Sequence, residues 1–302
     1  MRVLITGATG LVGTALVQSL NRDGHSVCRL LRKKDEDEQE TKEGCDLVWN
    51  PQSDEFGAEG QSADAIVNLA GASVADGRWT EDRKALLFSS RLDTTRGLVA
   101  AMEKMTMRPK VLVSASAIGY YGNRGDELLT EESSPRTDFL SRLAEQWEAE
   151  ALQARKLGVR VVLARFGVIL AKHGGALPQM IVPFKIGAGG KLGAGNQWMS
   201  WIALDDVVRA IRLAIENDQV LGPVNVVAPH PVTNAEFTTV LAQIMHRPAF
   251  FTMPPFVLRT LFGEMADGML LASQRVAPKV LEKFSYTFQH PSLRTALATL
   301  LG

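Results

Sequence analysis

The sequence predicts an α/β fold in which a doubly wound parallel sheet is joined to a smaller C-terminal α+β region. Apolar strands and amphipathic helices alternate over the first half of the chain, which is typical of parallel sheets with right-handed crossovers. The first strand runs directly into a glycine-rich turn and a helix. After residue 170 the alternation gives way to a glycine-rich stretch and further short elements. Together these observations predict one large α/β unit followed by a smaller region.

The first strand and helix carry the most specific motif. Residues 3–13 have the sequence VLITGATGLVG, in which Gly7, Gly10 and Gly13 recur at every third position. Gly7 permits a sharp turn, Gly10 lets a ligand approach the backbone, and Gly13 lets the helix pack closely on the sheet. The free N–H groups at the helix start favour a pyrophosphate. The alternative is a purely structural glycine turn, but the position between a strand and a helix favours a Rossmann-type dinucleotide site.

The end of the second strand determines which dinucleotide the site prefers. This strand is expected over residues 26–31, and Arg32 lies 19 residues after Gly13, close to the expected spacing of about 20. A guanidinium here accommodates the 2′-phosphate of NADP, whereas an acidic residue would select NAD. The alternative is a solvated charge run that continues through Lys33 and Lys34. We expect Arg32 to contact phosphate and the two lysines to be solvated.

The third long apolar strand is expected from residue 65 and ends in small residues. Ala70 and Gly71 follow Leu69, and small side chains let the backbone pass close to the adenosine and ribose. A long helix is expected over residues 80–105, and Arg91 within it could face the cofactor phosphates or lie on the surface. The polar segment between the second and third long strands holds one short expected strand, at residues 47–49.

Candidate catalytic residues follow the strand expected at residues 111–113. Residues 114–122 have the sequence SASAIGYYG, and the C-terminal ends of strands face the ligand crevice in doubly wound sheets. Ser116, Tyr120 and Tyr121 are therefore the candidates. A helix expected over residues 139–157 and a strand over residues 159–163 continue the alternation.

The second half of the chain is expected to return once to the sheet. The glycine-rich stretch 174–195 leads into Trp198 and Trp201, which favours a binding loop, or a loop rim with indoles in the core. Asp205 or Asp206 is expected to cap a helix that ends near residue 217. A strand at 222–228, a helix at 234–245 and a helical tail from Pro254 follow.

We divide the chain into two parts on this basis. Residues 1–170, with 200–230 returning to them, are expected to form the cofactor domain. Residues 171–199 and 231–302 are expected to form a substrate-binding region, which includes a short C-terminal domain from about residue 254.

The composition argues against several classes of function. The 33 basic and 33 acidic residues balance, so nothing favours nucleic acid or an anionic membrane as a partner. We find no signal-peptide pattern and no stretch near the roughly 20 apolar residues of a membrane helix. Cys28, in an expected strand, and Cys45, in an expected polar loop, fit a reducing compartment and no metal site. A cytoplasmic protein without a metal is the expectation.

These motifs resemble the extended short-chain dehydrogenase/reductase superfamily, in its nucleotide-sugar epimerase branch. TGATGLVG at 6–13, NLAG at 68–71 and the region 116–121 carry the general resemblance. The segments RWT at 78–80, SR at 90–91, GYYG at 119–122, WE at 147–148 and GNQW at 195–198 are similar to an atypical group of epimerase-family proteins with a short C-terminal domain. The resemblance covers essentially the whole chain.

The resemblance implies an NADP(H) site. The residues at the family's cofactor positions are Gly7, Gly10, Leu11, Val12, Leu31, Arg32, Leu69, Arg91 and Val168, and Thr9, Ala70 and Gly71 complete the expected set. It also moves Arg91 towards the phosphate interpretation.

The chain departs from this superfamily at its usual catalytic pair. That chemistry needs a tyrosine with a lysine four residues later, because the cation lowers the tyrosine pKa for proton exchange with the substrate. The three tyrosines are followed at that spacing by Arg124, Gly125 and His290, and the expected helix start is Phe139. Ser116 remains to bind a carbonyl oxygen, and Tyr120 or Tyr121 would have to replace the missing acid.

Two functions remain open from the sequence. The first is an NADP(H)-dependent oxidoreductase or epimerase-like enzyme acting on a small polar substrate, of a sugar-nucleotide-like kind. The second is an NADP(H)-binding module or redox sensor in which catalysis has been lost. The amphipathic helices at 80–105 and 139–157 could pair in a homodimer.

Overall fold

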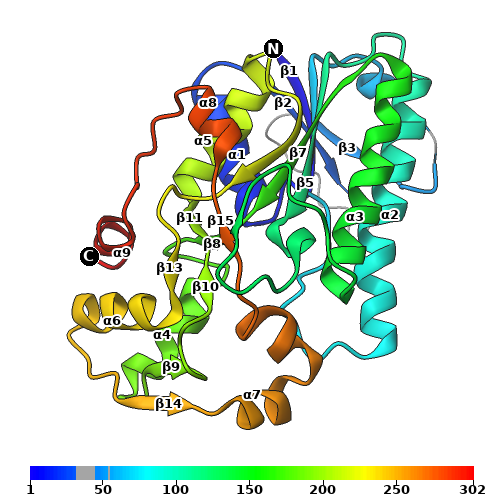
Figure 1. Ribbon diagram of the computed structural model, residues 1–302. Coiled ribbons are helices and arrows are strands. Elements are labelled where there is room, and N and C mark those ends of the chain that lie inside the picture. The colour runs from blue at the N-terminus through cyan, green and yellow to red at the C-terminus, as the bar shows by residue number, and fades with distance from the viewer. Residues whose placement is uncertain (32–44, 54) are drawn as a thin grey trace.

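The centre of the molecule is a parallel sheet of seven described strands, in the order β12-β7-β5-β4-β1-β2-β3 (Figure 1). The computed structural model describes residues 1–31, 45–53 and 55–302. All six neighbouring strand pairs run parallel. The strands are β1 Arg2–Thr6, β2 Ser26–Leu31, β3 Cys45–Val48, β4 Ala65–Asn68, β5 Val111–Ala117, β7 Arg160–Phe166 and β12 Gly222–Val226.

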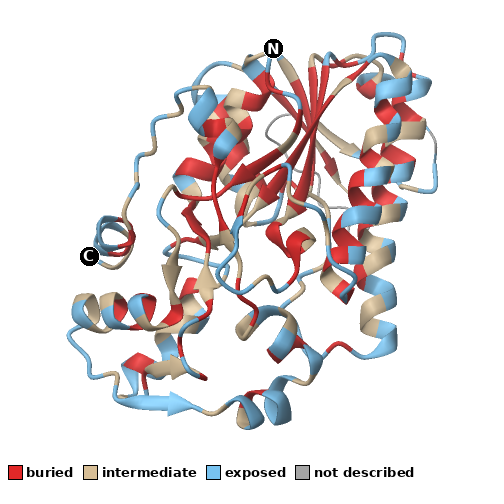
Figure 2. Cartoon of the chain, in the orientation of Figure 1, coloured by how far each residue is buried: buried red, intermediate tan, exposed pale blue. Residues whose placement is uncertain are grey.

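Helices cover both faces of this sheet, so that its strands are buried on both sides. Alternate residues of β1 point to opposite faces: Val3 and Ile5 pack in the same cluster as residues of α1 (Leu11–Arg22) and α5 (Leu204–Glu216). Leu4 packs in a second cluster with residues of α2 (Glu81–Glu103) and α3 (Phe139–Leu152). Figure 2 shows the resulting buried layer along the sheet. The predicted α/β, doubly wound fold class is confirmed.

Shorter elements make up the rest of the described chain, and many of them lie beyond the C-terminal ends of the strands (Figure 1). Those before residue 200 are η1 Ala58–Gly60, η2 Ile118–Tyr121, β6 Leu128–Leu129, η3 Gln153–Leu157, β8 Val168–Leu170, α4 Leu177–Lys185, β9 Gly190–Leu192 and β10 Trp198–Met199. Those after it are β11 Trp201–Ala203, β13 Val232–Thr233, α6 Asn234–Met245, β14 Phe251–Met253, α7 Pro255–Phe262, η4 Ala266–Leu270, β15 Arg275–Val276, α8 Lys279–Lys283 and α9 Leu293–Leu301. The pairing of β15 with β6 and of β14 with β9 brings the C-terminal segment back over this end of the sheet.

The prediction of a polar loop at Cys45 was wrong, because this residue lies in β3. Residues Cys28 and Cys45 are register partners on adjacent parallel strands, and the structure joins them in a disulfide. The two cysteines therefore do not indicate a reducing compartment. Within the part of the chain described, no helix is both long enough and apolar enough to cross a membrane.

Neither Asp205 nor Asp206 caps α5, contrary to the expectation. The helix begins at Leu204 after Ala203, without a side-chain cap. Asp206 is instead fully buried and accepts hydrogen bonds from the backbone N–H groups of Gln289 and His290. Its carboxylate therefore anchors the C-terminal tail.

Reduction of the Cys28–Cys45 disulfide is expected to lower the free energy of unfolding by about 3 kcal/mol. The bond links residues 17 apart in sequence, and a closed loop of that size restricts the unfolded chain by about this amount. Urea unfolding with and without a thiol reductant measures the difference. The Cys28→Ser/Cys45→Ser double variant serves as the control and should not respond to reductant. Two free thiols in the non-reduced, air-exposed protein would contradict the expectation.

Candidate functional site

A tightly packed glycine turn lies at the C-terminal ends of β1 and β4. Gly7 has φ +66°, and a Cβ there would lie 2.6 Å from the carbonyl carbon and oxygen of Leu69. A Cβ on Gly13 would lie 2.2 Å from the carbonyl oxygen of Gly7. The start of α1 therefore sits directly on the turn, as the motif predicted, and its first N–H groups face away from the strand end.

Buried polar side chains fix the strand ends beneath this turn. Thr6, Asn68 and Ser114 are register partners on β1, β4 and β5. Thr6 Oγ1 donates to Asn68 Oδ1 at 2.7 Å and accepts from the Leu69 N–H at 3.2 Å. Asn68 Nδ2 donates to Thr95 Oγ1 of α2 at 2.8 Å. These bonds hold the backbone around Gly7 and Leu69 in one arrangement.

Arg91 is a buried cation beside the same strand end. It is 9% exposed, donates to the carbonyl oxygens of Leu87 (3.1 Å) and Ala72 (2.9 Å), and stacks on the Trp147 ring. Burial, with a smaller repulsion from Arg83, lowers the pKa of Arg91 to about 10. No ion pair of Arg91 occurs among the described residues. A buried charge is costly unless it is paired, so an anion that binds beside Arg91 would be favoured electrostatically.

The remaining predicted cofactor residues come from several elements. Leu69, Ala70 and Gly71 follow β4, and a Cβ on Gly71 would lie 3.1 Å from Arg91 Cζ. Leu31 ends β2, and Val168 begins β8, where its N–H donates to Ser200 O. A Cβ on Gly175 would lie 2.9 Å from Leu11 Cδ2, so the segment after β8 reaches α1. Thr9 and Gly10 are exposed, and Leu11 and Val12 are half-buried. Arg32 lies outside the described residues.

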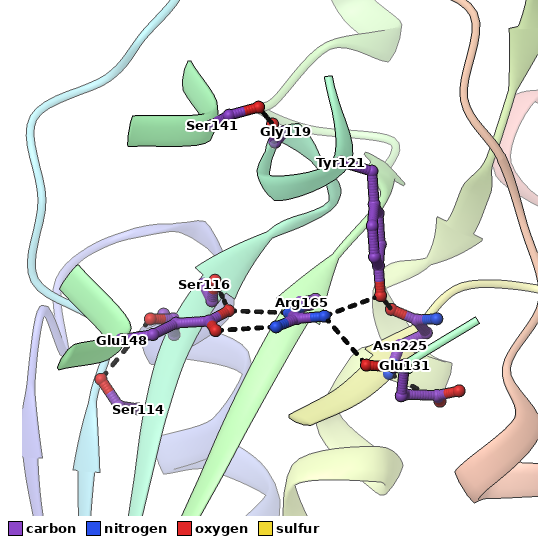
Figure 3. Close-up of polar contacts among 10 residues, drawn as sticks. Ser114, Ser116, Gly119, Tyr121, Glu131, Ser141, Glu148, Arg165 and Asn225 are labelled. Atoms are coloured by element: carbon purple, nitrogen blue, oxygen red, sulfur yellow. Dashed lines mark hydrogen bonds and ion pairs between the residues drawn. The ribbon is translucent and has the colours of Figure 1, made fainter. Parts of the chain in front are cut away.

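A second polar centre spans β5, β7 and β12 (Figure 3). Ser116 and Arg165 are register partners, as are Arg165 and Asn225. Ser116 Oγ donates to Glu148 Oε1 of α3 at 2.6 Å. Arg165 donates to both Glu148 oxygens at 2.8 Å, and both side chains are almost fully buried. Burial disfavours the charge on Arg165, but the hydrogen bonds to Glu148 outweigh it and raise the pKa of Arg165.

Tyr121 belongs to the interior of this network. It is fully buried; its hydroxyl donates to Asn225 Oδ1 at 2.7 Å and accepts from Arg165 Nη1 at 2.9 Å. Burial raises the pKa of Tyr121 to about 12, despite the opposing effect of Arg165. Because the phenol is enclosed and poorly acidic, its position argues against proton exchange with a substrate.

Tyr120 is the more accessible of the two neighbouring tyrosines. It is half-buried, and Arg165 Cζ lies 3.5 Å from its ring centroid. Burial raises the pKa of Tyr120, and the charge of Arg165 opposes that shift. A cation stacked on the ring therefore partly offsets the cost of ionising the phenol.

An apolar cluster occupies the place where the superfamily resemblance puts a catalytic tyrosine. Phe139, at the start of α3, is 5% exposed and packs 4.9 Å from the Trp79 ring and 5.8 Å from the Phe88 ring. Leu87, Leu143 and Met265 belong to the same cluster. The helix start therefore supplies packing and no proton, and a residue of the C-terminal segment covers it.

Glu148, Arg165 and Asn225 were not among the predicted site residues. A signal existed for each: Arg165 and Asn225 follow apolar residues within their strands, and Glu148 lies one turn after Ala144 on the buried side of α3. Such positions indicate burial, and a buried charge indicates a partner. Which residues pair could not be read from the sequence.

The two tryptophans after the glycine-rich stretch, in β10 and β11, differ in burial. Trp201 is fully buried in a core cluster, and its Nε1 donates to His230 O. Trp198 is half-buried, donates to Asp126 Oδ1 at 2.8 Å, and lies under the Arg275 guanidinium. Of the two interpretations, core packing holds for Trp201.

The comparisons with known proteins concern the family and the fold of the chain. The model of the NAD dependent epimerase/dehydratase family matches residues 3–227, and a domain of unknown function (DUF1731) matches residues 253–300. The chain is 42% identical over 296 residues to the epimerase family protein Mb2239 of Mycobacterium bovis, covering 98% of this chain and 96% of that protein. It is 39% identical over 303 residues to the epimerase family protein YfhF of Bacillus subtilis, covering 100% and 98%.

A solved structure extends the likeness to three dimensions. Human epimerase family protein SDR39U1, crystallised with NADPH, superposes with a TM-score of 0.88 at 34% identity and 99% coverage of both chains. The predicted resemblance to epimerase-family proteins with a short C-terminal domain is thereby confirmed. The chain belongs to the NAD dependent epimerase/dehydratase family.

Proposed function

We propose that this protein binds NADP(H) at the glycine turn and exchanges a hydride between the nicotinamide and a small polar substrate. The observation that carries the proposal is Arg91, a buried cation without an acidic partner in the described chain, placed against Gly71 beside the turn. A dinucleotide pyrophosphate would supply the missing negative charge. The NADPH bound to human SDR39U1, which shares 34% identity, supports the same choice of cofactor.

The polar centre at Ser116 favours an alcohol as the substrate group. Ser116 donates its only proton to Glu148, so its oxygen can accept a hydrogen bond from a ligand but cannot donate one. This arrangement fits the hydroxyl of a sugar-like substrate better than the carbonyl oxygen expected from the sequence. Tyr120, stacked on Arg165, is the phenol that we assign to proton exchange, and reduction and epimerisation both remain compatible with these roles.

The proposal also assigns the cofactor and the substrate to different parts of the chain. We assign the cofactor to residues 1–170 with 200–230, because β12 completes the sheet beside β7. We assign the substrate to residues 171–199 and 231–302, which include the separately matched segment 253–300. Pairing of two chains through α2 and α3 is part of this proposal and is tested by the mass of the protein in solution.

A second candidate is an NADP(H)-binding module without catalysis. Phe139, enclosed by Trp79 and Phe88 where a catalytic tyrosine would stand, favours it. Calorimetric titration with NADPH, followed by a spectrophotometric assay of NADPH oxidation over a panel of sugar and small carbonyl compounds, separates the two. Turnover supports the enzyme; tight binding without turnover over the panel supports the module; no binding of NADPH overturns both.

Replacing Arg91 by methionine is expected to lower NADPH affinity at least tenfold, because one charge-assisted contact contributes about 1.5–3 kcal/mol. The folded state should not be weakened to the same degree, since the variant also removes an unpaired buried charge. Calorimetry and thermal unfolding measure the two effects. Arg96→Met, on the exposed side of the same helix, is the matched control. Unchanged NADPH affinity in Arg91→Met would remove the main support for the proposal.

Arg32→Asp is expected to weaken NADPH binding tenfold or more while NADH binding is retained. The substitution replaces the cation expected at the 2′-phosphate with an acid that suits a ribose hydroxyl. Calorimetry with both nucleotides measures the preference. Equal affinity of the unmodified protein for NADH and NADPH would contradict this role.

A further inference from the structure

The acidic residues of this electrically balanced chain are distributed very unevenly. No Asp or Glu occurs between Glu150 and Asp205, or between Glu236 and Glu264. These two stretches supply α4, β9, β14 and α7. Lysines and arginines do occur in them, including Lys185 and Arg247, both exposed. The region built by these elements is therefore basic, although the whole chain carries no net charge.

The same elements expose an unusual amount of apolar surface. Besides Leu261 of α7 at 54%, five apolar side chains in or beside these elements are more than half exposed: Val182 54%, Ile186 76%, Phe250 88%, Phe251 60% and Phe256 69%. Figures 1 and 2 show β14 and α7 at the end of the molecule remote from the N-terminus, with all of β14 exposed. We call these five residues, with Lys185 and Arg247, the apolar–basic face.

Backbone contacts join these elements into one layer. β14 pairs with β9, and a Cβ on Gly190 would lie 1.8 Å from the Phe251 carbonyl oxygen. A Cβ on Gly189 would lie 2.5 Å from the Phe184 ring of α4. The Gly193 N–H donates to Met253 O at 2.8 Å, just before α7 begins. The exposed side chains thus share a common support and do not depend on separate loops.

Scattered apolar residues on a protein surface need no explanation, but a cluster of this kind marks an interaction site. A two-fold contact between copies would place the same patch against itself, and Lys185 and Arg247 would then face like charges. The two acids that follow α7 are already paired with cations: Glu264 with Lys84 at 2.6 Å, and Asp267 with Arg259 at 2.9 Å. The positive charge of the face therefore favours an anionic partner.

We propose that the apolar–basic face docks on the surface of an anionic phospholipid membrane. Exposed phenylalanines beside lysine and arginine are the composition of surfaces that lie at the boundary between headgroups and acyl chains. Phe250, Phe251 and Phe256 enter that boundary, and Lys185 and Arg247 bind headgroup phosphates. The chain attaches to one leaflet by this face and does not cross it. The face lies within the segments assigned to the substrate but contains none of the residues assigned to the cofactor, so lipid binding is tested independently of NADPH binding.

Flotation with lipid vesicles tests the docking. The full-length protein should float with vesicles of phosphatidylcholine and phosphatidylglycerol, should bind pure phosphatidylcholine at least tenfold more weakly, and should be released by salt. Lys185→Gln/Arg247→Gln should lower the partition about fivefold for each cation removed. Phe250→Ser/Phe256→Ser should lower it at least tenfold. Leu221→Ser, at an apolar residue 59% exposed outside the face, is the matched control and should bind as the unmodified protein does.

Thermal unfolding and NADPH affinity check that each variant is folded, and Phe250→Ser alone replaces the double variant if that one is not. Absence of binding to anionic vesicles overturns the proposal, as does equal binding to neutral ones. A dimer in solution that Phe250→Ser dissociates, without lipid binding, would assign the face to a second copy. A saturable complex with poly-aspartate, without lipid binding, would assign it to an acidic protein.

Discussion

Replacing Glu148 by alanine is expected to lower the free energy of unfolding by about 3–5 kcal/mol. Glu148 is the only carboxylate that pairs with Arg165 in the described structure, and the two side chains are 7% and 4% exposed. Removing one partner of a buried ion pair leaves an uncompensated charge, and that penalty has this size. Ser116 and Tyr121 would also lose part of the network that orders them.

Urea unfolding of Glu148→Ala beside Glu150→Ala gives the comparison. Glu150 lies on the same helix but pairs with Arg96, which is 60% exposed, and such surface pairs contribute at most about 1 kcal/mol. The double variant Glu148→Leu/Arg165→Met should recover most of the lost stability, because apolar residues of similar volume replace both charges. Similar losses in Glu148→Ala and Glu150→Ala would show that Arg165 finds another partner or water.

The sheet and its helices could be predicted because the signals that specify them are local. A strand of apolar residues, three glycines and an amphipathic helix follow each other within the first 20 residues, and the structure contains them with nearly the same bounds. α6 was predicted at its observed bounds, and its N-terminus carries a capping box from Thr233 and Glu236. Such features depend on neighbours in sequence, and the sequence displays those directly.

Long-range pairings could not be predicted in this way. Cys45 forms a disulfide because β3 pairs with β2 in a register that places it beside Cys28. The network at Ser116 is formed by residues of α3, β5, β7 and β12. Because Ser116 donates its proton to Glu148, its hydroxyl can accept a hydrogen bond from a ligand, whereas the sequence predicted that it would bind a carbonyl oxygen. Each residue is visible in the sequence as a polar group in an apolar setting, but only the fold determines its partner.

The balanced total charge gave no indication of the apolar–basic face. A sum of 33 basic and 33 acidic residues gave no reason to expect an anionic partner. Acidic residues are absent from two stretches of the sequence, and the fold brings these stretches together in α4, β9, β14 and α7. Charge counted by region, after the fold is known, is therefore the more informative quantity for this protein.

Gly10→Ala is expected to lower NADPH affinity at least tenfold while changing the free energy of unfolding by less than about 1 kcal/mol. Gly10 precedes α1 with φ −78° and ψ 175°, a conformation open to any residue. The nearest atom to its Cβ, apart from its chain neighbours, would be Gly7 O at 3.3 Å. The added methyl group therefore meets little protein, but it occupies the exposed start of the helix where the pyrophosphate would approach.

Gly13→Ala should separate the structural from the binding role of the same motif. Its Cβ would lie 2.2 Å from Gly7 O and 2.7 Å from Ala8 Cα. Because both are backbone atoms, α1 must shift, at a cost of about 1–3 kcal/mol in unfolding free energy. Gly57→Ala, where a Cβ meets nothing within 4 Å, controls for the loss of a glycine. If Gly10→Ala bound NADPH as tightly as Gly57→Ala does, the glycine turn would be a purely structural feature, and the cofactor would have to bind elsewhere.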